Sequence, residues 1–390
     1  MTSTPSVLLV AGAYYPEISA AGLQCQAAAA QLKDRARVSM LATAVDSSLP
    51  AAETVDGVSV HRLAIDVRSG RSKAGATVRL FRGLMKLLPE IDVVHVHGFS
   101  QKNVPVALMA RSMRKPVVLT LHTSGQDEPQ VAGARGALAN WAFRSARLIL
   151  PVSPNLARRC AEAGIPSSKV RLTPNGVQTD RFQPATAAER ETVRRELGWS
   201  ANDRVVVFVG FFSRDKRPDL LFRAWKRLVD RGVSAKLVYI GATASPYFEI
   251  DRSIAQNICQ DASALGRASD VIFVEPTHAM ERYYRAADVF VLSSIREANP
   301  VSLLEAMSCG LPCVASRIEG ATDVIVEDGV NGRLVECDDE DGLAGALAEV
   351  LSDPAAAHRM GARARDTVVN RYDIRQTADR WLQAYEDSLR

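Results

Sequence analysis

The chain has 390 residues, 47% of them hydrophobic, which is too many for one hydrophobic core of ordinary size and enough for two. Its 48 basic residues nearly balance its 44 acidic ones, so the net charge of +4 does not indicate a nucleic-acid-binding protein. The six cysteines lack the paired spacing of a zinc site, and their scatter favours a reducing compartment over a disulfide framework.

Short runs rich in β-branched residues predict two series of strands. Stretches with helical spacing separate several of these runs, as in the βα units of a parallel sheet. The pattern therefore predicts an α/β protein with two doubly wound, Rossmann-like domains. The first series lies at residues 6–10, 37–41, 92–97, 116–122 and 147–153, and the second at residues 204–210, 235–241, 270–276, 288–294 and 312–316.

A segment punctuated by proline, asparagine and glycine, residues 174–184, separates the two series. We therefore expect an N-terminal domain over residues 1–185 and a C-terminal domain over residues 186–370. Residues 371–390 have one apolar helical face and are expected to form a C-terminal helix.

No uninterrupted apolar run approaches about 18 residues, and the start of the chain does not have the form of a secretory signal. We expect a cytoplasmic protein, peripheral on the inner face of the plasma membrane if it meets a membrane.

Residues 67–89 hold six basic residues and no acidic one. The basic stretch 68–86 would suit an anionic membrane surface or an acidic acceptor. An ordinary surface helix packed on its own sheet is the alternative. If residues 77–88 are helical, Phe81, Leu84, Met85 and Leu88 share one face, and Arg79, Arg82 and Lys86 share another.

The stretch SSIREANPVSLLEAM, residues 293–307, places Glu297 and Glu305 eight positions apart. Asn299 is expected to be the N-cap of a helix with Pro300 at its first position. Glu297 would then lie in the loop before the helix and Glu305 on the helix, beside free backbone amides that suit an anion. The two carboxylates could bind the diols of two sugars. A surface acid and a helix-stabilising acid are the alternative.

Histidines mark two strand ends in the first series. His122 ends a strand, where chemistry is expected, although a lone histidine is often structural. His95 and His97 share a strand face, which suggests metal ligation, but no third ligand is evident. We favour a packed strand end with His97 or Gly98 lining a cleft. The acidic run at 338–341 is interpreted as a solvated loop and N-cap, so no metal site is expected.

The segment REANPVSLLEAMSCGLPCVAS, with its two acids, resembles the signature of family 4 retaining glycosyltransferases of GT-B architecture. The resemblance covers roughly residues 6–386 and includes VVVFVGFFSRDKRPDLLFRAWKRL, YYRAADVFVLSS and VNGRLVECDDEDGLAGAL. It implies two Rossmann-like parallel-sheet domains that face a central cleft, the first (1–185) on the acceptor side and the second (186–370) binding the donor. It also implies that the C-terminal helix crosses back to pack on the first domain.

The resemblance also implies roles for single residues. Glu305 would bind the ribose diol of the nucleotide, and Glu297 would approach the hydroxyls of the donor sugar. Lys216 matches a lysine that holds the donor diphosphate and would offset charge on the leaving group. The catalytic residues implied are His122, Lys216 and Glu297, and the donor-binding residues are Gly22, Gly210, Arg214, Lys216, Glu297, Asn299, Pro300, Val301 and Glu305.

Two departures from the family pattern affect these assignments. Phe211 follows the strand-terminal Gly210, where the family usually has arginine. Either Arg214 reaches the diphosphate instead, or one phosphate contact is lost. Ala21 and Gly22 stand where the family usually has a glycine pair, and a turn glycine is the alternative interpretation of Gly22.

The resemblance implies a retaining hexosyltransferase that uses a UDP or GDP sugar and a hydroxyl acceptor, without a metal or other cofactor. We expect a lipid-linked or envelope saccharide as acceptor, an anionic membrane surface as a further partner, and no nucleic acid. Two alternatives remain open. One is a nucleotide-sugar epimerase or sugar phosphorylase on the same architecture, and the other is a non-catalytic nucleotide-sugar-binding subunit.

Overall fold

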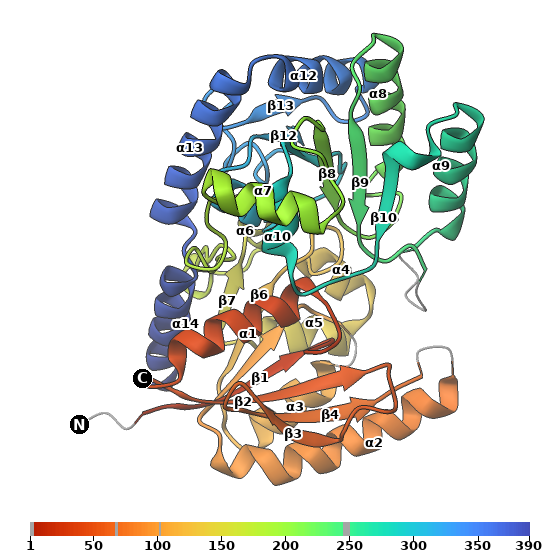
Figure 1. Cartoon of the computed structure of the whole chain (residues 1–390). Coiled ribbons are helices and arrows are strands. Elements are labelled where there is room, and N and C mark those ends of the chain that lie inside the picture. Colours follow the sequence, from red (N-terminus) through yellow and green to blue (C-terminus); the bar gives the residue numbers. More distant parts are fainter. Residues whose placement is uncertain (1–3, 67–68, 101–102, 245–249) are drawn as a thin grey trace. The chain divides into compact units, whose positions relative to one another are not determined.

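The structure is a computed structural model that describes residues 4–66, 69–100, 103–244 and 250–390, without the side chains of residues 70–74 (Figure 1). The chain divides into two compact units. The first unit comprises residues 1–176 and 374–390, and the second comprises residues 177–373. The boundary expected at residue 185 lies inside the second unit.

The first unit contains, within its described residues, a seven-stranded sheet in the order β3-β4-β2-β1-β5-β6-β7. Its neighbouring strands are parallel except for the β3 and β4 pair, which the strand predictions missed. Asp56 and Gly57 join these two strands with positive φ angles of 51° and 82°, as a two-residue hairpin turn requires. The strands are β1 (Ser6–Ala11), β2 (Arg37–Ala44), β3 (Ala52–Val55), β4 (Val58–Ala64), β5 (Val93–His97), β6 (Val117–Leu121) and β7 (Leu148–Pro151).

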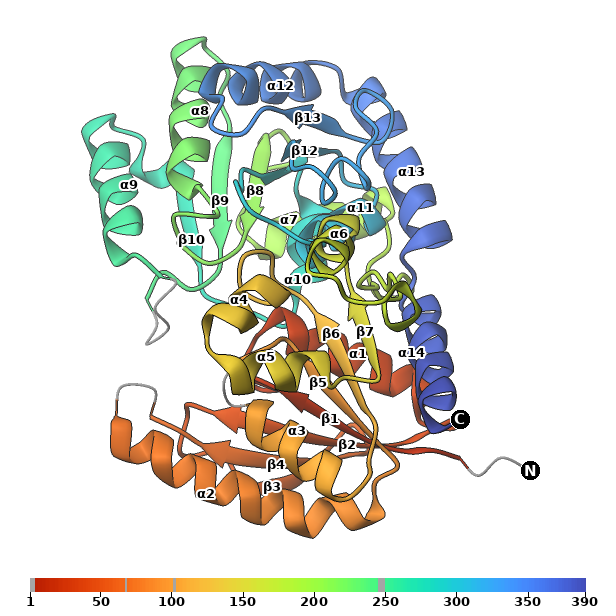
Figure 2. The ribbon, with the colours of Figure 1, turned by 180° about the vertical axis from the view of Figure 1, so that it is seen from behind.

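Helices cover both faces of this sheet. The first helix, α1, packs with the C-terminal helix α14 on one face, and α2, α3 and α5 follow one another on the other (Figures 1 and 2). Helix α14 buries Ile374, Trp381 and Tyr385 in the core of the first unit. The helices are α1 (Ala20–Leu32), α2 (Gly70–Leu87), α3 (Asn103–Ser112), α4 (Pro129–Ala134), α5 (Ala137–Arg144), α6 (Pro154–Glu162) and α14 (Ile374–Leu389).

Helix α2 contains most of the predicted basic element. Leu84 and Leu88 are buried as expected, but Met85 is 55% exposed, so the apolar face is narrower than predicted. Arg68 lies outside the described residues, as do the side chains of Arg71 and Lys73. Among the described residues, no helix has both the length and the apolar character needed to cross a membrane.

The second unit contains a six-stranded parallel sheet, counted over its described residues, in the order β10-β9-β8-β11-β12-β13. Strands β9 and β10 extend it on one side of β8, and β11 begins the other side. Ligands of open α/β sheets bind outside the carboxyl ends of the strands at such a switch point. The strands are β8 (Val205–Val209), β9 (Lys236–Ile240), β10 (Val271–Val274), β11 (Val289–Leu292), β12 (Cys313–Ser316) and β13 (Arg333–Val335), the last of which was not predicted.

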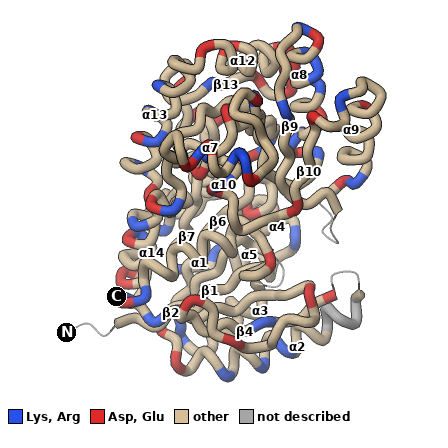
Figure 3. The backbone as a smooth tube through the Cα atoms, in the orientation of Figure 1, with Lys and Arg blue, Asp and Glu red and all other residues tan. Residues whose placement is uncertain are grey.

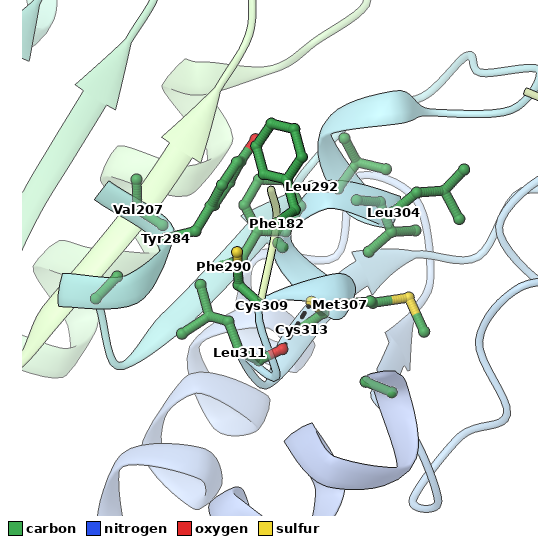
Figure 4. Packing of buried hydrophobic residues seen from close by; sticks show 14 of the residues in the cluster. Phe182, Val207, Tyr284, Phe290, Leu292, Leu304, Met307, Cys309, Leu311 and Cys313 are labelled. Atoms are coloured by element: carbon green, nitrogen blue, oxygen red, sulfur yellow. Dashed lines mark hydrogen bonds between the residues drawn. The ribbon is translucent and has the colours of Figure 1, made fainter. Parts of the chain in front are cut away.

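Alternate residues of β8 point to opposite sides of this sheet, as the two-residue period of a strand requires. Val205 and Val207 join the core that α11 covers (Figure 4), and Val206 and Phe208 join the core under α8 and α12. The helices are α7 (Ala187–Glu196), α8 (Pro218–Asp230), α9 (Arg252–Ala264), α10 (Met280–Ala286), α11 (Val301–Ser308), α12 (Glu340–Ser352) and α13 (Pro354–Arg371).

Candidate functional site

Two loops meet at the switch point of the second unit, one after β8 and one after β11. Gly210 directly follows β8, and a β-carbon there would lie 3.3 Å from the Phe208 ring and 3.8 Å from Cγ of Lys216. The aliphatic stem of Lys216 therefore packs close to the Gly210 backbone. The Lys216 amide donates to the carbonyl of Ser213 at 3.1 Å, which fixes the residue just before α8.

Lys216 and Glu297 form an ion pair between these loops. The ammonium Nζ lies 2.6 Å from Oε1 of Glu297, and only 8% of the Glu297 side chain is exposed. The Ser293 hydroxyl donates to the Lys216 carbonyl at 3.0 Å, and the Ile295 amide donates to the Asp215 carbonyl at 2.8 Å. These two hydrogen bonds and the ion pair therefore connect the two loops. The loops hold a cation and a carboxylate together at the carboxyl edge of the sheet.

Helix α11 begins one residue later than predicted. Pro300 is its N-cap, with an extended backbone (ψ 109°), so Asn299 is not the cap and Val301 is the first helical residue. Proline has no side-chain hydrogen-bonding group, and Asn299 is buried beside it. The first amides of α11, like those of any helix, have no acceptor within the helix, and this positive end of the helix dipole begins four positions after Glu297 in the chain.

Glu305 lies on α11 and has partners different from those of Glu297. The hydroxyl of Tyr284 donates to its Oε2 at 3.0 Å. Burial raises the pKa of Glu305 to about 7, while the Tyr284 hydrogen bond and the charge of Arg181 act to lower it. The two predicted carboxylates are therefore distinct: Glu297 is neutralised by a lysine, and Glu305 is half-buried beside a phenol.

The structure does not bring Arg214 to the Lys216 and Glu297 pair. Its side chain is 88% exposed and its Nε lies 3.4 Å from Asp251. Arg214 instead lines a surface pocket with Phe222 and Ile258 of the α8 and α9 region. Arg214 was predicted to replace the arginine that is missing at position 211. This role stays a prediction, and the position of the Arg214 side chain does not favour it.

In the first unit, the buried carboxylate of Asp127 holds the loops after β5 and β6 together. Its Oδ2 accepts the amides of His122 at 2.8 Å and Thr123 at 2.9 Å, and its Oδ1 accepts the amide of Phe99 at 2.7 Å. Burial raises the pKa of this carboxyl, and the three N–H groups oppose that effect. Asp127 thereby fixes the backbone of His122 at the end of β6.

His122 belongs to a cluster of three histidines. Nε2 of His122 lies 3.0 Å from Nδ1 of His97, while His95 contacts the hydroxyls of Tyr385 at 2.8 Å and Thr120 at 2.7 Å. Burial lowers the pKa of all three rings, that of His122 to about 4, so they are uncharged at neutral pH.

Neither metal-site interpretation gains support from the side-chain geometry. Both ring nitrogens of His95 already have protein partners. Asp338 of the acidic run pairs with Arg217, and Asp339 caps α12. In the part of the chain that the structure describes, no group of three or more His, Cys, Asp or Glu side chains is arranged to hold a metal ion.

Gly22 lies in the first turn of α1. Its amide donates to the Ser19 hydroxyl at 3.0 Å, and a β-carbon would lie 2.5 Å from the carbonyl oxygen of Ala13. This close approach requires glycine whether or not a ligand binds, so the packing explanation for Gly22 is sufficient.

Sequence reasoning missed Tyr284 and Asp127, the two residues that hold Glu305 and His122. Tyr284 is one of two adjacent tyrosines, and only helix geometry shows which of them faces α11. Asp127 lies six residues after the end of β6, and it belongs to no recognisable sequence motif. The feature that identifies both residues is the burial of a polar side chain, which cannot be recognised from a single sequence.

Comparisons with known proteins identify the family of the chain. Residues 189–367 match the family model described as glycosyl transferases group 1, and residues 24–181 match that of glycosyltransferase family 4. D-inositol 3-phosphate glycosyltransferase of Geodermatophilus obscurus is 30% identical over 342 residues, which cover 81% of this chain and 73% of that protein. N-acetyl-alpha-D-glucosaminyl L-malate synthase of Bacillus anthracis is 25% identical over 306 residues, covering 77% and 76%.

Two solved structures have the same fold. The Anabaena protein HepE in complex with UDP and glucose matches with a TM-score of 0.80 at 18% identity, over 98% of this chain and 100% of that one. Sucrose-phosphate synthase from Thermosynechococcus elongatus matches with a TM-score of 0.81 at 20% identity, over 98% of each chain. At these identities the likeness shows the fold alone.

Proposed function

The chain belongs to glycosyltransferase family 4 and is a glycosyltransferase of GT-B fold, and from this premise we propose that it moves a hexose-type sugar from a UDP or GDP sugar to a hydroxyl acceptor with retention of configuration. The observation that carries the proposal is the ion pair of Lys216 with Glu297 beside the start of α11. A cation and free helix amides suit a diphosphate, and an adjacent carboxylate suits sugar hydroxyls.

Lys216 can serve the diphosphate without leaving Glu297. An ammonium has three N–H donors, and the 2.6 Å contact with Glu297 uses one of them. The other two are free by stoichiometry to donate to phosphate oxygens. In this proposal Lys216 stabilises the charge that develops on the leaving diphosphate, while the amides at Val301 and beyond contribute the helix dipole.

Glu305 and Glu297 would hold the two sugars of the donor. The ribose diol needs an acceptor for two hydroxyls, which an ionised Glu305 provides. Glu297 would accept from hydroxyls of the transferred hexose, and the uncharged His122 of the first unit would contact the donor sugar near the point of transfer.

Retention follows from transfer on one face of the sugar. The bond from the anomeric carbon to the phosphate oxygen breaks while the acceptor oxygen bonds on the same face. The departing phosphate oxygen takes the acceptor proton, so the protein supplies neither a nucleophile nor a base. Lys216 and the helix amides take the part that a metal ion would play, so the proposal includes metal-independent transfer.

We propose a lipid-linked or envelope saccharide as the acceptor and an anionic bilayer as the surface that α2 meets. Arg82 and Lys86 are exposed on α2 together with Val78 and Met85, which are 50% and 55% exposed. Figure 3 shows basic positions in blue along α2. Basic and apolar side chains on one exposed surface suit anionic headgroups. The names of the relatives specify inositol 3-phosphate and malate, so a small anionic acceptor is the competing candidate.

The first test is calorimetric titration with UDP, GDP, ADP and dTDP, each with Mg²⁺ and with EDTA. We expect tight binding of UDP or GDP that survives EDTA and is lost in Glu305→Ala. Turnover of the matching sugar nucleotide, with the anomer of the product identified by NMR, then tests retention. An inverted product, or a donor epimerised without any acceptor, would contradict the proposal.

Vesicle binding tests the membrane surface separately. Sedimentation with phosphatidylglycerol vesicles should fall severalfold in Arg82→Glu/Lys86→Glu, a double change four residues apart on α2. Arg359→Glu/Arg363→Glu, with the same spacing on exposed positions of α13, is the matched control. Equal losses in both double variants would show nonspecific charge attraction and remove α2 from the proposal.

A further inference from the structure

Tyr284 is a fully buried tyrosine whose hydroxyl is directed to a functional carboxylate. It lies on α10 with 1% of its surface exposed, and its ring packs against Phe182 and Phe290 at centroid distances of 6.1 and 6.0 Å (Figure 4). Its hydroxyl lies 3.0 Å from Oε2 of Glu305. Burial and the nearby charge of Glu305 raise the pKa of the phenol, so it remains a hydrogen-bond donor.

We propose that Tyr284 is the positioning residue of the nucleotide site, and that its hydroxyl holds the Glu305 carboxylate in the orientation and negative charge that a ribose diol requires. The inference rests on the proposed function, which assigns the ribose to Glu305. It adds a residue that never touches the nucleotide and acts only through Glu305.

The hydrogen-bonding capacity of a carboxylate makes this arrangement productive. An ionised carboxylate accepts at about four positions on its two oxygens, and Tyr284 occupies one of them on Oε2. Oε1 and a second position on Oε2 remain for the two hydroxyls of a diol. A protonated Glu305 carries a hydrogen on one oxygen and loses part of this capacity, so nucleotide binding favours the ionised form.

The charge of Glu305 depends on opposing effects on its pKa. Burial raises its pKa to about 7, and the carboxylate of Glu281 acts in the same direction. The Tyr284 hydrogen bond is first among the opposing influences, followed by Arg181, which is itself paired with Glu281 at 2.8 Å. Cys309, the C-cap of α11, stays a neutral thiol because burial raises its pKa.

The direction of the pH effect follows from this balance. Protons compete with the diol, so nucleotide affinity is full above the pKa of Glu305 and falls as pH falls through it. Loss of the Tyr284 hydroxyl removes a donor that favours the ionised form, so the pKa of Glu305 rises further. A tyrosine that only fills the core would have no such effect, because phenylalanine preserves the ring.

Calorimetric titration with UDP and GDP from pH 6 to 9 measures the consequence for binding. Tyr284→Phe should weaken binding about tenfold at pH 7, the size of one hydrogen bond to a charged group, and should approach wild-type affinity at pH 9. Tyr372→Phe is the matched control, because Tyr372 is 4% exposed in the same unit and its hydroxyl donates to the Val324 carbonyl at 3.4 Å. It should bind as the wild type does at every pH.

A second measurement needs no nucleotide. The Glu305 carboxyl carbon can be followed by NMR of ¹³C-labelled protein across the same pH range and assigned by its absence in Glu305→Gln. We expect its titration midpoint to move upward in Tyr284→Phe and to stay unchanged in Tyr372→Phe. An unchanged midpoint in Tyr284→Phe would overturn the inference. A wild type that binds no nucleotide while the midpoint still moves would overturn the proposed function instead.

Discussion

The carboxyl edges of the two sheets hold chemically opposite sites. In the second unit, Nζ of Lys216 and Oε1 of Glu297 form an ion pair at 2.6 Å. In the first unit, His95, His97 and His122 are uncharged because burial lowers the pKa of each. Both sites lie where parallel strands end, so position in the fold does not account for the difference.

The difference lies in whether a buried group has a partner of opposite charge. Desolvation penalises every charge, and Lys216 and Glu297 offset that penalty for each other. Glu305 accepts a hydrogen bond from the Tyr284 phenol, and although this bond and the charge of Arg181 act to lower its pKa, burial raises the pKa to about 7. The histidines have neutral partners and lose their protons. A fixed charge pair suits a diphosphate, and neutral imidazoles suit hydroxyl groups.

Removal of Lys216, the cation of the charged site, should have the largest effect and tests the contrast between the two sites most directly. Lys216→Ala should lower kcat by about 100-fold or more while changing KM for the donor much less, because charge stabilisation matters most as the diphosphate leaves. Glu305→Ala should chiefly raise KM. Steady-state kinetics measure both, and Lys226→Ala, an exposed lysine on α8, is the control. Equal, mild losses in Lys216→Ala and Glu305→Ala would contradict these assignments.

The next test weakens the hydrogen bonds by which Asp127 fixes the backbone next to the histidine cluster. Asp127→Asn retains one carbonyl oxygen but replaces the other by an amide NH₂ group that faces protein N–H donors. An unsatisfied buried amide costs about 1 to 3 kcal/mol, so the free energy of unfolding should fall by about 2 kcal/mol. Urea denaturation measures this fall, with the exposed Asp34→Asn of the same unit as control. An unchanged stability would show that Asp127 does not organise these loops.

The sequence predicted the two sheets well because their central strands are apolar runs that any folding chain must bury. It missed the hairpin of β3 and β4, although Asp56 and Gly57 are a recognised two-residue turn signal between alternating residues. The three-residue β13 is too short for its periodicity to be recognised.

The candidate site was predictable only in its chemistry. Glu297 and Lys216 stand out in the sequence, but their contact depends on two loops that are 81 positions apart. The side-chain direction of Arg214 and the helix start after Pro300 depend on backbone angles that a single sequence does not display. Partners such as Tyr284 and Asp127 emerge only when the fold brings distant segments together.

The pH profile of activity sharpens the comparison further. As pH falls through about 7, Glu305 gains a proton and kcat/KM for the donor should fall, by up to tenfold per pH unit. His122 has a pKa of about 4 and should contribute nothing above pH 6. Rates measured from pH 6 to 9 should therefore show an acid limb that Glu305→Gln abolishes and His122→Asn preserves. The reverse result would assign the limb to the histidine.

The smallest expected effect comes from a second buried tyrosine, which contacts a neutral group. The hydroxyl of Tyr385 lies 2.8 Å from Nδ1 of His95, a distance similar to the 3.0 Å between the Tyr284 hydroxyl and Oε2 of Glu305. A hydrogen bond between neutral groups contributes about 1 kcal/mol, less than one to a carboxylate. Tyr385→Phe should therefore lower the free energy of unfolding by about 1 kcal/mol, measured in urea, and leave the pH profile of kcat/KM unchanged. A shifted profile would mean that the histidine cluster titrates with the active enzyme, and the contrast between a charged and an uncharged site would fail.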